Sequence, residues 1–236
     1  MIARQRGDLD FLAFQELEAL PGLLHGVTTR QLDLAAAGPQ AEPNLERLRL
    51  ALGLRRLAWV RQVHGTEIVA VNGEEALPAA QADGLATDRP GVGLLIKQAD
   101  CQAVILAAPQ KGVIANLHAG WRGNIAGMPA KGVEFLAQRY GVAPDELYAA
   151  VSPSLGACCG EFVNWREELP QWFQRFKVGE NHFDLEAATR HQLEAAGVRP
   201  QRIFISGRCT VCQGEFFSYR RDKTIGRFGT VVALRE

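Results

Sequence analysis

Three residues of this sequence, His64, Cys101 and His118, are of the types that bind a transition metal or cooperate in nucleophilic catalysis. Each is expected at the end of a short apolar strand, where a side chain can point into a cleft. Two imidazoles and one thiolate suit Zn²⁺. Three protein ligands leave one tetrahedral position open, as in catalytic zinc sites, where the pKa of a bound water falls to about 7. Because the three residues are far apart in sequence, the pattern alone leaves open that they are independent core and corner residues.

The segment His118-Ala-Gly-Trp-Arg-Gly123 is the strongest local signal. It follows the apolar run 112–117 and precedes a segment with helical spacing, which predicts a strand, a tight glycine corner and a helix. Gly120 and Gly123 would let the backbone turn sharply and lie close to a ligand. Arg122 and the N–H groups of the first helical turn would face the same space, which would suit an anion.

The same atoms also permit a cysteine hydrolase. Cys101 would be the nucleophile, His64 or His118 its base, and Asp83 or Asp100 the group that orients the base. Zinc and a nucleophilic thiolate would compete for one sulfur, so these two interpretations exclude each other. Copper oxidase chemistry fits less well, because it needs many imidazoles and often an axial methionine, whereas the chain has 5 His and 2 Met. A non-enzymatic, zinc-stabilised interaction module is a third alternative.

Four further polar residues are candidates for substrate binding, namely Arg30, Gln62, Arg122 and Arg220. The arginines stand beside glycine or small polar residues and could hold a phosphate by bidentate hydrogen bonds, although each could also be a solvated surface charge. Gln62, two residues before His64, could position substrate by pairing with a base edge or an amide, or could bond the backbone.

The other cysteines give a weaker signal. Cys209-Thr-Val-Cys212 is a Cys-x-x-Cys pair, which could be half of a zinc knuckle or a redox pair. Cys158 and Cys159 are adjacent and poorly spaced to chelate one ion. The sequence therefore favours unpaired thiols near a loop.

Composition excludes several classes of protein. The 236 residues are 47% hydrophobic and 22% charged, which is ordinary globular composition. The net charge is zero and no apolar run could span a bilayer, so neither a nucleic-acid nor a membrane partner is expected. The N-terminus lacks an apolar signal region, and 5 cysteines without a disulfide framework indicate a reducing compartment. We therefore expect a cytoplasmic protein.

Strand-like and helix-like segments alternate without a linker or a repeat, which predicts one α/β or α+β domain over residues 1–236 with a sizeable mixed sheet. The expected strands are 57–63, 66–71, 92–96, 103–107, 147–151, 203–206 and 228–234. The expected helices are 44–54 with Asn44 as N-cap, 125–140 with Pro129 in its first turn, 162–176, and 184–196 ending at Gly197. Residues 1–30 read as a short polar start and an apolar segment, and residues 31–43 and 76–84 read as loops.

A series of motifs, in this order along the chain, closely resembles the laccase-domain family, also called the YfiH or polyphenol oxidase family, from about Leu24 to the C-terminus. The motifs are His25-Gly-Val-Thr-Thr-Arg30, Gln62-Val-His-Gly65, Ala82-Asp-Gly84, Ala99-Asp-Cys101, His118-Ala-Gly-Trp-Arg-Gly123, Ser152-Pro-Ser-Leu-Gly-Ala-Cys-Cys159, Cys209-Thr210, Phe216-Phe-Ser-Tyr-Arg-Arg221 and Gly226-Arg227. No single motif is specific, but the ordered series is.

The resemblance implies a single-domain, sandwich-like α/β fold with mixed sheets flanked by helices. It implies a zinc site formed by His64, Cys101 and His118. It also implies phosphorolysis of adenosine, inosine, guanosine and methylthioadenosine, with adenosine deamination as a second activity. Related proteins have been assigned an amidase role in editing peptidoglycan precursors, and the family name carries an older copper-oxidase label.

The chain departs from the family pattern around the expected pocket. Pro43-Asn-Leu-Glu46 runs straight into a helix, where members usually carry a longer loop. Asp100-Cys-Gln-Ala103 lacks the usual proline, and Cys158-Cys-Gly-Glu-Phe162 replaces Cys-Cys-Tyr-Glu-Val. The metal triplet is intact, so these changes are expected to affect substrate range more than catalysis.

Overall fold

Two stacked sheets of six strands each form the centre of the computed structural model, which describes residues 1–35, 40–223 and 225–236. In spatial order the first sheet contains β1 (Ile2–Arg6), β2 (Leu9–Ala13), β3 (Leu23–Thr28), β12 (Phe228–Leu234), β7 (Val92–Gln98) and β4 (Arg56–Trp59). The second contains β11 (Ile203–Ile205), β10 (Tyr148–Val151), β8 (Gln102–Ala108), β9 (Val113–Ala119), β6 (Gly84–Thr87) and β5 (Ile68–Ala70). Both sheets are mixed, with parallel pairs β4–β7, β5–β6 and β10–β11.

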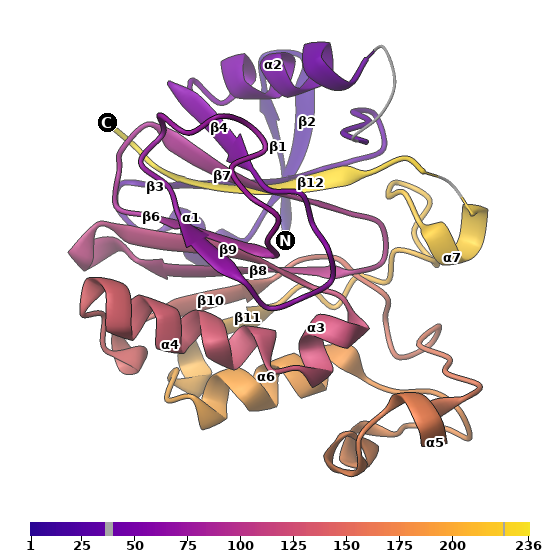
Figure 1. The fold of residues 1–236 in the computed structure, drawn as a ribbon. Helices are drawn as coiled ribbons and strands as arrows, with labels where there is room; N and C mark the ends of the chain where they lie inside the picture. Colours follow the sequence, from indigo (N-terminus) through magenta and orange to yellow (C-terminus); the bar gives the residue numbers. More distant parts are fainter. Residues whose placement is uncertain (36–39, 224) are drawn as a thin grey trace.

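Helices cover the outer faces of this sandwich (Figure 1). Helix α2 (Ala41–Ala51) packs on the first sheet through an apolar cluster that Leu45 and Leu48 share with β7 and β12. Helices α4 (Met128–Tyr140) and α6 (Leu185–Ala195) pack on the second sheet. The remaining helices are the short α1 (Gln15–Glu18), α3 (Trp121–Ile125), α5 (Trp165–Glu168) and α7 (Tyr219–Asp222), and the 3-10 turns Pro109–Lys111, Pro144–Glu146, Gln171–Phe176 and Pro200–Arg202. The expected sandwich-like α/β domain with flanking helices is confirmed.

The alternation of side chains along the central strands builds two apolar layers at once. On β8, Ile105 faces the first sheet, whereas Val104 and Leu106 face the helices on the other side. All three are fully buried, and each such side chain contributes about 1.5–3 kcal/mol to folding. A one-residue shift in register would exchange the two layers, so the buried pattern fixes the position of every strand end.

Strand β9 carries two polar residues into the space between the sheets. The Asn116 amide donates to the carbonyl oxygens of Leu94 (2.9 Å) and Thr230 (2.8 Å) on the facing sheet. Because side chains alternate along a strand, His118 lies on the same face two residues later, at the end of the sandwich. The strand that joins the sheets therefore also aims His118.

Several expectations about the elements were incomplete or wrong. The first 30 residues form the antiparallel β1–β2 hairpin and β3 rather than a polar start, and β6 begins at Gly84, the last residue of the expected 76–84 loop. Asn44 is not an N-cap, since α2 begins at Ala41 and the Asn44 amide instead donates to the carbonyl oxygen of Asp33 at 2.7 Å. Of the loop expected over 31–43, residues 36–39 lie outside the described residues.

The remaining helices show how proline and capping residues set their ends. The helix expected over 162–176 is broken into α5 and the 3-10 turn Gln171–Phe176, because a proline at 170 disfavours helical backbone before it. Pro129 in the first turn of α4 is confirmed. So is α6, where the Asp184 carboxylate accepts from the N–H of Ala187 at 2.8 Å and Gly197, with φ 97°, follows the end. None of the helices described is both long and apolar enough to cross a membrane.

His25 on β3 makes stability depend on pH. The ring is 6% exposed, and its Nε2 accepts the N–H of Phe14 at 2.8 Å. Burial lowers the pKa of His25 to about 4, whereas an unfolded histidine titrates near about 6.5. The unfolded chain therefore takes up the proton first, so the stability from this group is complete above the unfolded pKa and is lost as pH falls toward the folded one, by about 3 kcal/mol.

We expect His25→Gln, whose amide oxygen can still accept from Phe14, to flatten this dependence. The measurement is the free energy of unfolding by urea from about pH 7 down to about pH 4, in the variant and in the wild type. A variant whose stability fell with pH as steeply as that of the wild type would contradict the assignment to His25.

Candidate functional site

Two of the three expected metal-binding residues lie where the chain passes from one sheet to the other, and the third lies near the end of a strand. His64 lies on the segment from β4 in the first sheet to β5 in the second, and Cys101 joins β7 to β8 across the same gap. His118 lies near the end of β9. Their ligand atoms all lie within 4.8 Å of one another. The fold therefore brings together residues that the sequence keeps far apart.

Asp83, directly before β6, holds both histidines. Its carboxylate is fully buried and accepts the backbone N–H groups of Val63, His64 and Gly65 at 2.7–3.2 Å. A carboxylate oxygen also lies 2.8 Å from Nδ1 of His118. Burial alone would raise the pKa of Asp83, but the hydrogen bonds lower it, so the group is charged at neutral pH. A charged Asp83 keeps the proton on Nδ1 of His118 and leaves Nε2 as the ligand atom.

Cys101 is chemically primed by its neighbours. Burial by itself would raise the pKa of the Cys101 thiol, but the rings of His118 and His64 lower it to about 6. Burial would lower the pKa of His118, but Cys101 and Asp83 raise it to about 9. At neutral pH the pair is therefore a thiolate beside an imidazolium. A thiolate is the form of cysteine that binds metal or attacks a carbon. A bound metal cation would replace the proton on Nε2 of the His118 imidazolium, while the proton on Nδ1 stays with Asp83.

The backbone around His64, Cys101 and His118 has features that few other residues would allow: a glycine without free space for a Cβ, and two non-glycine residues with positive φ. A Cβ on Gly120 would lie 3.0 Å from the Cys101 sulfur and 3.1 Å from Cδ2 of His64, so only glycine leaves both side chains in place. His64 and Asp100 adopt φ of 62° and 82°, which is uncommon for residues with a side chain and costs about 1–3 kcal/mol each. The donor set, the glycine cradle and the buried carboxylate behind His118 together fit an ion of the size and type of Zn²⁺.

The three residues open into a cavity of about 1560 Å³. Among the described residues that line it, basic side chains outnumber acidic ones; the basic ones are Arg61, Lys97, Arg122, Arg220, Lys223 and Arg227, and the acidic ones Asp100, Glu161 and Glu168. Aromatic rings also contribute, including Trp59 and the edge-to-face pair of Trp121 and Phe162 at 5.8 Å. The lining suits a ligand with both an anionic group and a flat apolar part.

The four candidate substrate residues have different environments. Arg122 lines the cavity and stacks on Trp121, with its guanidinium carbon 4.1 Å from the ring centroid. Arg220 lines it too, but its guanidinium donates to the carbonyl oxygen of Glu161 at 2.9 Å.

Gln62 and Arg30 are less suited to bind a ligand in this cavity. The Gln62 amide is engaged with the backbone of Lys97 at 2.8 and 3.0 Å, the backbone alternative left open by the sequence. Arg30 lies elsewhere, in a smaller depression beside Glu215, where it stacks on Phe217 at 5.5 Å from the ring centroid.

Sequence reasoning did not single out Lys97. This lysine stands on β7 among fully buried apolar residues, lines the cavity, and lies 5.2 Å from the Trp59 ring centroid. Burial lowers its pKa to about 8. The available signal was a charged residue directly after the apolar run 92–96 of the same strand. Asp100, by contrast, cannot orient either histidine as the hydrolase alternative allowed, because its carboxylate accepts from the Thr210 hydroxyl at 2.6 Å and the Arg220 N–H at 2.7 Å.

The sequence and the fold of this chain are similar to those of known proteins. Residues 36–235 match a family model described as multi-copper polyphenol oxidoreductase laccase. The chain is 35% identical to the purine nucleoside phosphorylase YlmD of Geobacillus stearothermophilus, over 79% of this chain and 75% of the relative. It is 35% identical to a purine nucleoside phosphorylase of Deinococcus radiodurans, over 89% and 88%. The crystal structure of the hypothetical protein YfiH of Bacillus licheniformis superposes with a TM-score of 0.83 at 26% identity, covering 92% of this chain and 95% of that one.

We expect Asp83→Asn to weaken metal binding by about 10–100-fold, because the amide no longer fixes the charge or the tautomer of His118. Zinc affinity measured by competition with a chromogenic chelator tests this. Asp88→Asn is the matched control, since Asp88 lies just beyond the same strand, β6, but is exposed. Equal affinities of both variants and the wild type would show that Asp83 does not support the ligand.

Proposed function

The chain belongs to the multi-copper polyphenol oxidoreductase laccase family, and from that membership and the geometry of the site we propose that it is a zinc-dependent purine nucleoside phosphorylase. Its substrates would be adenosine, inosine, guanosine and methylthioadenosine, with adenosine deamination as a second activity. The observation that carries the proposal is the group of His64, Cys101 and His118, oriented by Asp83 and opening into a cation-lined cavity. The two relatives named purine nucleoside phosphorylase support the substrate class.

The metal would be held by one ring nitrogen of His64, the sulfur of Cys101 and Nε2 of His118. Thiolate and imidazole donors in this number match zinc, and the bound ion would supply Lewis-acid polarisation of a water or substrate oxygen. Multi-copper chemistry fits the donors less well. Among the described residues only two imidazoles join the group, and no methionine lines the cavity to serve as an axial ligand.

Phosphorolysis moves the ribosyl group from a purine nitrogen to phosphate: the bond from C1′ to the base breaks, and a bond from C1′ to a phosphate oxygen forms. The protein must therefore hold an anion next to a flat base. Arg122 and Lys97 are the side chains that we assign to phosphate, and Trp121 and Phe162 provide an aromatic wall for the base. We assign Arg220 and Gln62 to shaping this cavity, since their polar atoms contact the backbone.

We further propose that residues 1–236 act as one such domain in the cytoplasm. All 5 cysteines are described, and none forms a disulfide. This agrees with a reducing compartment, in which Cys101 and the other thiols remain available as ligands.

One observation favours a second candidate function. Cys101, His118 and Asp83 form a thiolate, imidazolium and carboxylate in the order used by cysteine hydrolases, so an amidase acting on a peptidoglycan precursor is the alternative. Chelation separates the two. The zinc enzyme loses activity when metal is removed, whereas a thiol hydrolase keeps it and is instead inactivated by iodoacetamide.

We expect the purified protein to release hypoxanthine from inosine only when phosphate is present. His118→Ala should lower the rate by at least about 100-fold, because it removes a metal ligand, while circular dichroism shows an intact fold. Chromatography of the products, together with the metal content, provides the measurement. Hypoxanthine released equally without phosphate, or full activity in His118→Ala, would contradict the proposal.

Arg122→Ala should raise the KM for phosphate by about 10-fold or more, because a charge-assisted contact to the anion is lost. The KM for inosine should change much less. Arg139→Ala is the matched control, since Arg139, like Arg122, stacks on an aromatic residue adjacent in sequence, here Tyr140, but does not line the cavity. Steady-state kinetics with phosphate as the varied substrate test this, and equal phosphate KM values in both variants would remove Arg122 from the phosphate site.

A further inference from the structure

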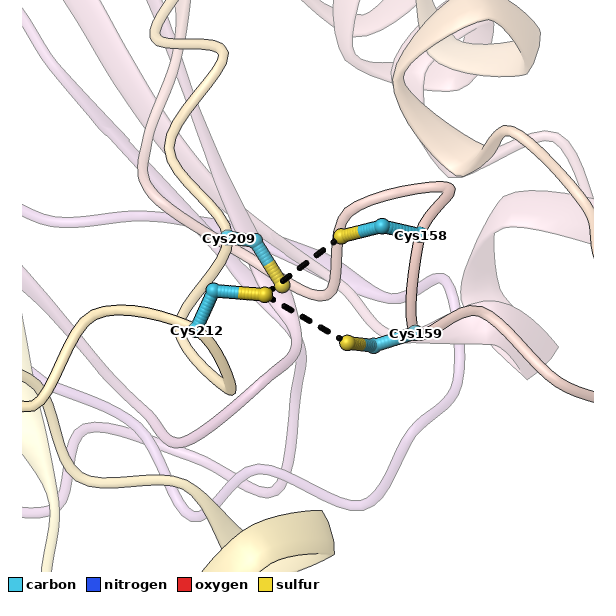
Figure 2. Close-up of side chains that lie close together, drawn as sticks. All are labelled: Cys158, Cys159, Cys209 and Cys212. Atoms are coloured by element: carbon cyan, nitrogen blue, oxygen red, sulfur yellow. Dashed lines mark hydrogen bonds between the residues drawn. The ribbon is translucent and has the colours of Figure 1, made fainter.

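Four cysteines outside the site described above converge on one point. The sulfurs of Cys158, Cys159, Cys209 and Cys212 all lie within 4.8 Å of one another, and Figure 2 shows two loops presenting them face to face. The four thiols are unpaired and lie near loops, as expected. Their sequence spacing did not predict that one loop turns the sulfurs of the adjacent Cys158 and Cys159 toward the Cys-x-x-Cys turn.

The spacing of the sulfurs matches a single tetrahedral ion. The sulfur of Cys212 lies 3.6 Å from the sulfurs of both Cys158 and Cys159. With zinc–sulfur bonds of about 2.3 Å, the edge of a regular four-sulfur tetrahedron is about 3.8 Å. A disulfide would need sulfurs about 2.05 Å apart. A cluster of several irons would need room between the sulfurs for its own metal and sulfide atoms, which a group this tight does not leave.

We propose that these four cysteines bind one Zn²⁺ as a closed structural site, separate from the group of His64, Cys101 and His118. Binding forms four zinc–sulfur bonds, and the thiol protons leave to solvent. Because all four positions are occupied by protein, no position remains for substrate.

The two loops are held together by the backbone up to the cluster. The parallel pair β10–β11 is extended beyond the strand ends, where Ser154 N–H donates to the Arg208 carbonyl (3.1 Å) and Thr210 N–H to the Ser154 carbonyl (2.9 Å). A Cβ on Gly156 would lie 2.9 Å from Cβ of Cys209 and 3.5 Å from the Cys158 sulfur. Glycine therefore permits the close approach of the loops that brings the four sulfurs together.

The Cys-x-x-Cys turn is built to present its sulfurs. The N–H of Gln213 donates to the Cys209 carbonyl at 3.0 Å, which closes the turn. The Arg221 guanidinium donates to the carbonyl oxygens of Thr210 (2.7 Å) and Val211 (3.1 Å), the two residues between the cysteines. The same guanidinium is ion-paired with the Asp222 carboxylate at 2.7 Å, which holds it in place against the turn. Contacts of this kind commonly fix the ligands of metal sites.

The site would brace one wall of the cavity. Leu155, Cys159 and Val211, on the two loops, line it. Both loops also hold Asp100, the residue before Cys101: the Leu155 N–H donates to its carbonyl at 2.8 Å, and the Thr210 hydroxyl donates to its carboxylate at 2.6 Å. An ion joining the loops would therefore stabilise the backbone that positions Cys101.

Metal counting on the whole chain tests the proposal. Wild type, Cys212→Ser and Cys209→Ser are equilibrated with zinc under reducing conditions, freed of excess by gel filtration, and analysed for metal per chain. We expect each variant to hold one zinc fewer than the wild type. Because the result is a difference, it stands whether or not His64, Cys101 and His118 also bind metal. Substitution of the buried Cys209 could lower the zinc content by disturbing the fold. Cys212 is exposed, so a loss of zinc in Cys212→Ser reports the loss of a ligand.

Cys101→Ser is the matched control, because it removes the fifth cysteine and leaves the four intact. Its zinc should show four sulfur neighbours at about 2.3 Å by X-ray absorption, if His118→Ala is added to empty the other site. The four thiols of this variant should react with a thiol reagent only after chelation. Equal zinc in the wild type and Cys212→Ser, iron in place of zinc, or a disulfide among the four in reducing buffer would each overturn the proposal.

Discussion

The buried carboxylate of Asp83 is the constraint on which the site depends. It accepts three backbone N–H groups from the turn at Val63, His64 and Gly65 and holds Nδ1 of His118. A buried charge that lost its partners would destabilise the fold by about 3–5 kcal/mol, so the turn and the ring cannot move independently of it. One side chain thereby fixes the backbone of one candidate metal ligand, His64, and the tautomer of another, His118.

The two-sheet architecture decides where that constraint can act. His118 belongs to the second sheet and Asp83 lies directly before its strand β6, whereas His64 and Cys101 lie on segments that arrive from the first. Asn116 joins the layers by donating to carbonyl oxygens of the facing sheet, which buried polar groups between sheets must do to be satisfied. The donors can meet only at the end of the sandwich, where side chains no longer fill the gap and a cavity opens.

The structure contains two groups of candidate metal ligands with similar donor atoms, and their surroundings suit different roles. His64, Cys101 and His118 provide three protein ligands beside a large cavity, which suits chemistry on a substrate. The four remaining cysteines provide four sulfurs between two loops, the number of ligands in a closed structural zinc site, which suits a brace. Asp100 links them, because its carboxylate accepts from Thr210, which lies between Cys209 and Cys212 of the second group, while its neighbour Cys101 belongs to the first.

The sequence by itself determined the layered α/β class, most central strands and the capped helix α6, and through a family resemblance it singled out His64, Cys101 and His118 as candidate metal ligands. These depend on local periodicity, on capping residues such as Asp184, and on ordered motifs, all of which are readable along the chain. The tertiary structure alone decided that Asp83 orients His118, that Gln62 is engaged with backbone, and that Cys158 and Cys159 face the Cys209–Cys212 turn. Each of these is a contact between segments distant in sequence. The local sequence pattern does not encode such a contact, because the contact forms only when the two sheets pack and bring the ends of different strands together.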